Sequence, residues 1–140
     1  MQRIVRLLTS AAALAGVLGV GVAIAASGPP ADLTRHVAGG GVTVAATLLT
    51  DRTDATAIHL ALNTHSVNLD GYHFDRMTLL RDDQGKTYAL EAVEGASGSG
   101  HHRQAVLRFA RADAGAKAVE LIVKDVAGVK ERTFRWSMAN

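Results

Sequence analysis

Downstream of Gly41, apolar and polar residues alternate along the chain with a period close to two. This period is typical of β-strands that bury one face, because successive side chains point to opposite sides of a strand. Seven short runs show the alternation, and clusters of turn-forming residues separate them. The runs cover residues 42–48, 58–63, 77–80, 86–92, 103–109, 119–123 and 131–136.

Seven short strands, with no convincing amphipathic helix after the N-terminal region, predict an all-β fold. We expect an immunoglobulin-like antiparallel β-sandwich over residues 42–137, and a small β-barrel is the alternative. Residues 26–41 are interpreted as a linker that ends in three consecutive glycines. Asp82 and Asp83 precede Gly85, which can take the positive φ that closes a hairpin, so these two aspartates are expected to form a turn rather than a calcium site.

The N-terminal region has the order of charges and apolar residues that export requires. Arg3 and Arg6 precede an uncharged, mostly apolar run at residues 7–26. Basic residues stay on the cytoplasmic side while such a run enters the bilayer. Residues 1–25 are therefore predicted to be a signal peptide cut after Ala25 or an uncleaved N-terminal membrane anchor. Both alternatives place the remaining chain outside the cytoplasm, in a periplasm, at a cell surface or secreted, and only an uncleaved segment 7–26 would contact the membrane.

Composition narrows the possible functions. The chain has no cysteine, so it forms no disulfide and its domain must be held by its core alone. It carries 15 Lys and Arg against 13 Asp and Glu, and two of the fifteen are Arg3 and Arg6, so the two signs balance in the remainder. No basic patch with interleaved aromatic residues is present, so we expect no nucleic-acid partner.

Histidines gather in two segments that the strand pattern places in loops, residues 63–73 and 98–103. Neutral imidazoles are good ligands for copper and zinc, and a carboxylate can complete or orient such a site. The candidate metal ligands are His65, His101, His102, Asp70 and His73. Adjacent residues of a strand point to opposite faces, so His101 and His102 could share an ion only where a loop or bulge interrupts the strand.

The competing interpretation is that these histidines face water or donate to backbone carbonyls, while the same loops contact a partner protein. The candidate binding-loop residues are Thr64, Ser66, Tyr72 and Arg103. No serine lies in a nucleophile elbow and no carboxylate pair shares evident burial, so we expect no enzymatic activity.

Several short motifs support a resemblance at the family level. They are Thr64-His65-Ser66-Val67-x-Leu69-x-Gly71-Tyr72, Asp82-Asp83-x-Gly85, Gly100-His101-His102-Arg103 and Phe134-x-Trp136. With these motifs the chain resembles a group of short exported bacterial proteins with an immunoglobulin-like domain and no assigned function. The resemblance covers roughly residues 42–136. It implies the fold and directs attention to the histidines, but it implies no reaction and no ligand.

Two functions from different classes follow. The first is an exported binding or accessory module of unknown ligand, which contacts another protein through loops or a sheet edge. The second is a copper or zinc domain that uses His65, His101 and His102. The sequence identifies neither the partner nor a cofactor.

Overall fold

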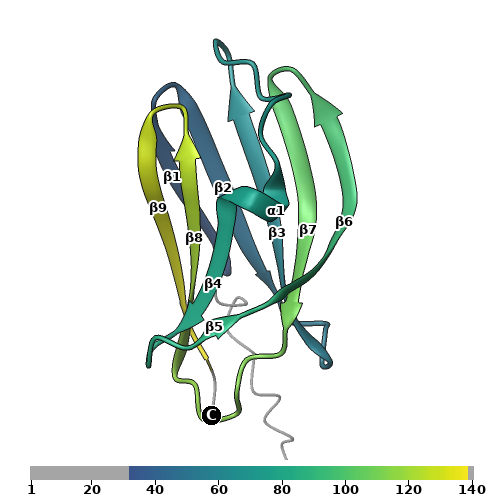
Figure 1. Ribbon diagram of the computed structural model, residues 1–140, viewed down its shortest axis with the longest axis vertical. Coiled ribbons are helices and arrows are strands. Elements are labelled where there is room, and N and C mark those ends of the chain that lie inside the picture. Colours follow the sequence, from purple (N-terminus) through teal and green to yellow (C-terminus); the bar gives the residue numbers. More distant parts are fainter. Residues whose placement is uncertain (1–31, 139–140) are drawn as a thin grey trace, which may run out of the picture. The chain divides into compact units, whose positions relative to one another are not determined.

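The computed structural model describes residues 32–138, which form nine β-strands and one short helix (Figure 1). The elements are β1 (Thr34–Gly39), β2 (Val42–Leu49), β3 (Ala55–Thr64), α1 (Phe74–Met77), β4 (Thr78–Asp82), β5 (Thr87–Tyr88), β6 (Leu90–Ser99), β7 (His102–Ala110), β8 (Ala118–Val126) and β9 (Val129–Ser137). The predicted signal peptide or anchor at residues 1–25 lies outside the described residues. Within residues 32–138, no helix is long and apolar enough to cross a membrane.

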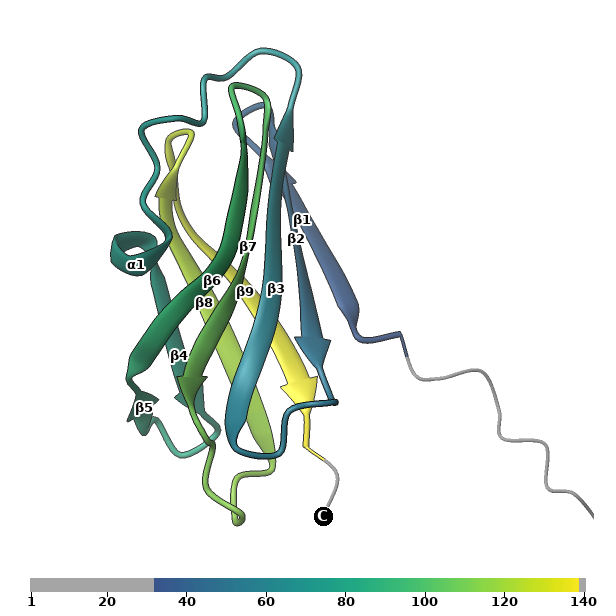
Figure 2. The ribbon, with the colours of Figure 1, turned by 90° about the vertical axis from the view of Figure 1, so that its right-hand side faces the viewer.

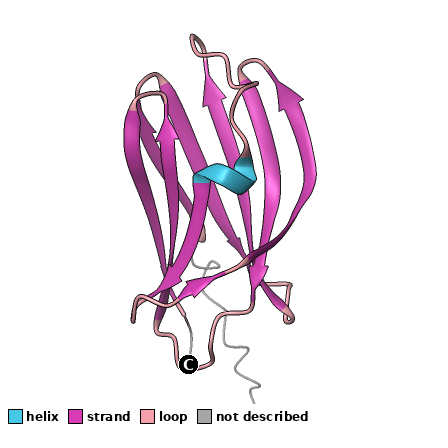
Figure 3. Ribbon diagram, in the orientation of Figure 1, coloured by secondary structure: helices cyan, strands magenta, loops and turns pink. Residues whose placement is uncertain are grey.

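The strands form two antiparallel sheets that face each other as a β-sandwich (Figures 1 and 2). The larger sheet has the order β1-β2-β3-β7-β6, and the smaller has the order β5-β4-β8-β9. Figure 3 shows that strands make up nearly all of the regular structure, with α1 as a single turn on the way from β3 to β4. The predicted all-β fold is therefore confirmed.

Strand β1 corrects the predicted linker. It pairs with β2 over its whole length, from Thr34 opposite Thr47 to Gly39 opposite Val42, so the domain begins before residue 42. Gly40 and Gly41 form the two-residue turn between the strands, and both have positive φ, as a type I′ turn requires. The alternation was too weak to reveal β1, because Val37 is the one large apolar residue of the strand.

The predicted strand at residues 86–92 is also corrected, because it divides between the two sheets. Thr87 and Tyr88 pair with β4 in the smaller sheet, whereas the chain from Leu90 onward pairs with β7 in the larger one. Strand β6 then runs to Ser99, so it includes the first residues of the predicted loop segment 98–103. Small residues at an exposed edge show no alternation, and two register shifts interrupt what pattern there is.

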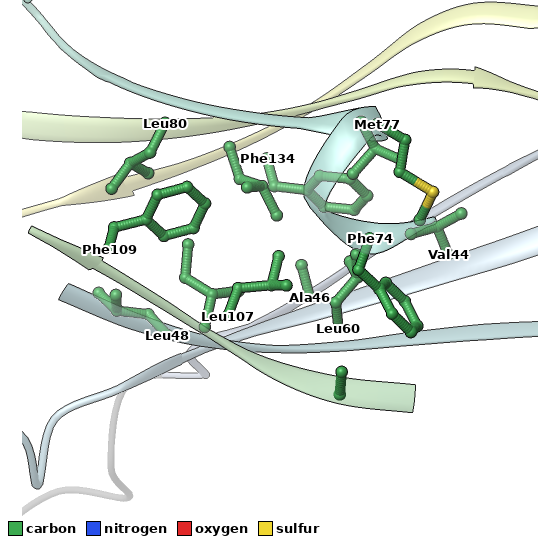
Figure 4. Close-up of a cluster of buried hydrophobic side chains, with 14 of the residues drawn as sticks. Val44, Ala46, Leu48, Leu60, Phe74, Met77, Leu80, Leu107, Phe109 and Phe134 are labelled. Atoms are coloured by element: carbon green, nitrogen blue, oxygen red, sulfur yellow. The ribbon is translucent and has the colours of Figure 1, made fainter. Parts of the chain in front are cut away.

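The inward-facing residues of both sheets form one core (Figure 4). Val44, Leu60, Leu107 and Phe109 from the larger sheet lie against residues such as Phe134 from the smaller one, and the alternation predicts this inward orientation for all five. The side chains of α1 that close one edge of the core, Phe74 and Met77, are buried as well. The core members that the structure describes extend from Leu33 to Met138.

A buried arginine holds the two sheets together at one end. Arg132 of β9 is 1% exposed and donates hydrogen bonds to the carbonyl oxygens of Val126 (2.9 Å) and Gly39 (2.6 Å). Burial lowers the pKa of this guanidinium. Its Nε has no hydrogen-bond partner and it forms no ion pair with another residue of the described chain. Its role is thus to satisfy backbone carbonyls where β1 approaches the β8–β9 hairpin.

Candidate functional site

Four connections gather at one end of the sandwich, which we call the loop end (top of Figure 1). They are the β1–β2 turn, the segment 65–73 between β3 and α1, the β6–β7 turn and the β8–β9 turn. The described chain contains a hollow of about 450 Å³ here. It is lined by Gly41, Thr43, Asn63, Thr64, His65, His101 and His102. Three histidines from the two predicted loop segments therefore share one hollow.

The β6–β7 hairpin explains how two adjacent histidines reach the same hollow. Ser99 pairs with His102 across a two-residue turn. The first turn residue, Gly100, has a φ of 63°, whereas the φ of the second, His101, is negative. This is the pattern of a type II′ turn. His101 lies in the turn, outside the strand alternation, and His102 is the first residue of β7. The imidazole Nδ1 of His102 contacts the amide oxygen of Asn63 on the neighbouring strand.

The end of β3 and the segment 65–73 that follows it are both hydrogen-bonded to the turn of this hairpin. The amide of Thr64 donates to the carbonyl of His101 (3.0 Å), and the amide of Leu69 donates to that of Gly100 (2.8 Å). In return, the Gly100 amide donates to a carboxylate oxygen of Asp70 (2.7 Å). Asp70, a candidate metal ligand, is thus engaged in holding two loops together.

Arg103 and Tyr72 connect the same segment to β7 and to the β8–β9 turn, respectively. Arg103 donates to the carbonyls of Leu69 (3.0 Å) and Tyr72, and its guanidinium lies 5.1 Å from the centre of the Phe74 ring. The Tyr72 hydroxyl accepts a hydrogen bond from the amide of Ala127 in the β8–β9 turn (2.9 Å). Both residues are candidates for direct binding, and the structure shows that their polar groups also satisfy backbone atoms of the loop end.

Thr64 has a similar structural role. Its buried hydroxyl donates to the carbonyl of Gly41 (2.6 Å) and accepts hydrogen bonds from the amides of Ser66 (3.2 Å) and Val67 (3.1 Å). This arrangement turns the chain sharply as β3 ends. Ser66 itself is exposed, as are His65 and His101, so these side chains remain available to a ligand.

The candidate metal ligands do not all converge. His73 lines a different hollow of about 260 Å³, together with Arg76, Lys124 and other residues near α1. Across residues 32–138, no group of three or more His, Cys, Asp or Glu side chains is arranged so that it could hold one metal ion. The shared histidine hollow can therefore offer fewer imidazoles to one ion than the sequence suggested.

The sequence interpretation missed Thr43 and Asn63 as lining residues. They are cross-strand neighbours on the outer face of the larger sheet, since Thr43 pairs with Asn63 and Asn63 pairs with His102. The alternation predicts that all three positions face away from the core. It does not predict that they are neighbours, because that depends on the strand order, which local patterns do not supply.

The end opposite the loop end is organised by carboxylates. Buried Asp82 accepts hydrogen bonds from the amides of Gln84 (2.9 Å) and Lys86 (3.0 Å) and from the Tyr88 hydroxyl (2.8 Å). Burial acts to raise the pKa of Asp82, but these hydrogen bonds outweigh it and the net pKa is lowered. The amides of Lys117 and the next residue donate to Asp83, and they lower its pKa. The expectation that both aspartates form turns is met by this geometry.

Comparison with known proteins gives no match: no protein-family model, no curated protein and no solved structure is found to be similar to this chain. The resemblance to exported immunoglobulin-like proteins stays a prediction. Function must therefore be argued from the geometry of the chain itself.

Proposed function

We propose that this protein is an extracytoplasmic immunoglobulin-like module, without catalytic activity, that binds a partner protein through its loop end. The observation that carries the proposal is the combination of an ordered backbone and free side chains. Hydrogen bonds between segment 65–73 and the β6–β7 turn fix the loops, while His65, Ser66 and His101 stay exposed. A surface that is already ordered loses little conformational entropy on binding, so more of the contact energy appears as affinity.

The strand order supports the immunoglobulin-like assignment. Immunoglobulin domains place strands A, B, E and D in one sheet and C, F and G in the other, and some add a strand C′ beside C. If β2 is taken as A, then β2-β3-β7-β6 reads A-B-E-D and β5-β4-β8-β9 reads C′-C-F-G. Strand β1 is an addition before A.

The same correspondence favours the loop end as the binding surface. The segment between β3 and β4 takes the place of the B–C loop, and the β8–β9 turn takes that of the F–G loop. In antibody variable domains these two loops lie at the antigen-binding end. The exposed residues of the loop end point to the same surface independently of the fold.

Export rests on the sequence alone. The basic residues Arg3 and Arg6, the apolar run at 7–26 and the small residues that end at Ala25 form its basis. Fusion of residues 1–31 to a reporter that is active only outside the cytoplasm should give activity. N-terminal sequencing of the exported chain then distinguishes a cleaved signal from an anchor, and an inactive fusion would refute export.

Site-specific photo-cross-linking in the producing cell tests the binding proposal. A photoreactive residue replaces His65 or His101 in the full chain, and the matched control replaces exposed Lys117 at the opposite end. We expect one discrete cross-linked species from the two loop-end positions and none from position 117. Equal products from both ends, or none from positions 65 and 101, would refute a partner at this surface.

A copper or zinc site is the second candidate, because His65, His101 and His102 line one hollow. Two imidazoles with water would bind an ion more weakly than a closed site of four protein ligands. Calorimetric titration of residues 26–140 with zinc and copper(II) should show binding that the double substitution His65→Ala and His101→Ala removes. If the wild-type protein binds no more tightly than the double variant, the metal proposal fails.

A further inference from the structure

The end opposite the loop end contains two adjoining hollows that the proposed function does not use. One measures about 440 Å³ and the other about 420 Å³, and both are lined by Arg52, Ala55, Thr56 and Met138. Each volume lies in the range of about 300–1,000 Å³ that is typical of small-molecule sites. Sharing four residues makes them two lobes of one groove, which we call the terminal groove.

The first lobe is largely apolar. Leu33, Leu48, Leu49, Ala55 and Met138 line it, together with neutral hydroxyl side chains and Arg52. Leu33, Leu49 and Met138 are only half-buried, although Leu33 and Met138 pack against the core. An apolar lining with few polar groups is the usual composition of a site for an apolar ligand.

The second lobe adds a positive charge. Of its charged lining residues, Arg52 already pairs with Glu94 (3.4 Å) and Asp113 with Lys86 (2.7 Å). Arg111 is exposed and forms no ion pair with another residue between 32 and 138. A guanidinium that is free of an internal partner can form charge-assisted hydrogen bonds with a carboxylate.

The backbone around the groove is fixed, so the two lobes have a defined geometry. The Thr56 hydroxyl, on a side chain that is 5% exposed, accepts a hydrogen bond from the amide of Ala112 (2.9 Å). The amide of Met138 donates to the carbonyl of Lys117 (2.8 Å). These bonds hold the start of β3, the β7–β8 connection and the end of β9 together around the groove.

We propose that the terminal groove binds a single-chain aliphatic carboxylate, with its hydrocarbon chain against Leu33, Leu49 and Met138 and its carboxylate on Arg111. The apolar lobe provides the burial and the arginine selects the charge. This binding is separate from the contacts of the loop end, since the two surfaces share no residue.

Three soluble probes separate the parts of this proposal. Residues 26–140 are titrated with decanoate, with acetate, which has the carboxylate without the chain, and with decyltrimethylammonium, which has the chain with the opposite charge. We expect saturable binding of decanoate alone, with chemical-shift changes at the methyl groups of Leu33, Leu49 and Met138. Binding of all three probes, binding of none, or shifts confined to other residues would overturn the proposal.

Two substitutions locate the charge. Arg111→Gln should weaken decanoate binding about tenfold, because a charge-assisted hydrogen bond at an exposed site is lost. Arg76→Gln, at an exposed arginine near the loop end, should leave it unchanged. Equal affinities of the two variants would overturn the assignment of Arg111.

A comparison of two chain lengths tests whether the chain fills its own groove. If decanoate binds residues 32–140 but not residues 26–140, the chain's own residues 26–31 occupy the groove and the ligand proposal is wrong.

Discussion

The two ends of the sandwich differ in the side chains that satisfy most of their backbone groups. At the loop end, side-chain donors satisfy backbone carbonyls: Arg132 bonds to Gly39 and Val126, and Arg103 bonds to Leu69 and Tyr72. At the opposite end, carboxylates accept from backbone amides. An arginine has five donors on a long side chain and can reach carbonyls on separate hairpins, whereas an aspartate satisfies amides within its own turn or the one beside it. Arg132 and Arg103 thus join separate segments at the loop end, whereas Asp82 closes the turn that follows it.

The largest effect should come from Arg132→Ala. It leaves two carbonyls without their donor and opens space between the β1–β2 and β8–β9 hairpins, so we expect a loss of about 3 kcal/mol in the free energy of unfolding. Urea unfolding measures this loss, with Arg135→Ala on the exposed face of the same strand as control. Equal losses in the two variants would show that Arg132 does not join the hairpins.

Two glycines of the loop end should differ because of their surroundings. A Cβ on Gly40 would lie 2.1 Å from the carbonyl oxygen of Ala127, whereas a Cβ on Gly100 would meet nothing within 4 Å. Both have positive φ. We therefore expect Gly40→Ala to cost about 2–3 kcal/mol and Gly100→Ala about 1 kcal/mol, from backbone strain alone. Thermal or urea unfolding of the pair checks the difference, and a larger cost at Gly100 would contradict it.

A smaller effect is expected at the opposite end from Tyr88→Phe. The hydroxyl donates to the carboxylate of Asp82 and accepts from the amide of Asp113 (3.1 Å). Its removal therefore deprives the buried Asp82 carboxylate of one hydrogen-bond donor. We expect a loss of about 1–2 kcal/mol in the free energy of unfolding, with the loop end unaffected. Amide exchange across the domain would locate the change, and faster exchange at Leu69 would contradict a local effect.

Acid should act on the opposite end through Asp82 and Asp83. Their pKa values are lowered in the folded protein, so these groups stabilise the fold above the pKa of the unfolded chain, near 3.8. That contribution is lost as pH falls below 3.8 through the lowered folded values. The free energy of unfolding should therefore fall between about pH 4 and pH 2, and less steeply for Asp82→Asn. Identical slopes for the variant and the wild type would contradict the role of Asp82.

The same contrast explains what the sequence could and could not predict. Inward positions such as Val44, Leu60 and Phe134 follow from alternation, since burial of one face is a local pattern. Strand β1 and the far half of β6 lie at sheet edges, where small exposed residues carry no such pattern. The candidate residues Thr64, Asp70, Tyr72 and Arg103 were of the right polar types, but each has a partner that lies 23 to 55 residues away in the chain. Only the tertiary structure shows that they bond to the backbone of the loop end.

The contact that fixes segment 65–73 to the β6–β7 turn orders the surface that His65 and His101 occupy. Amide hydrogen exchange of Leu69 tests it most directly, since that amide donates to the carbonyl of Gly100. We expect slow exchange at Leu69, comparable with the paired strands, and faster exchange in Asp70→Ala, which removes the reciprocal bond. Exchange at Leu69 as fast as in an unstructured peptide would show that segment 65–73 is not fixed to the β6–β7 turn.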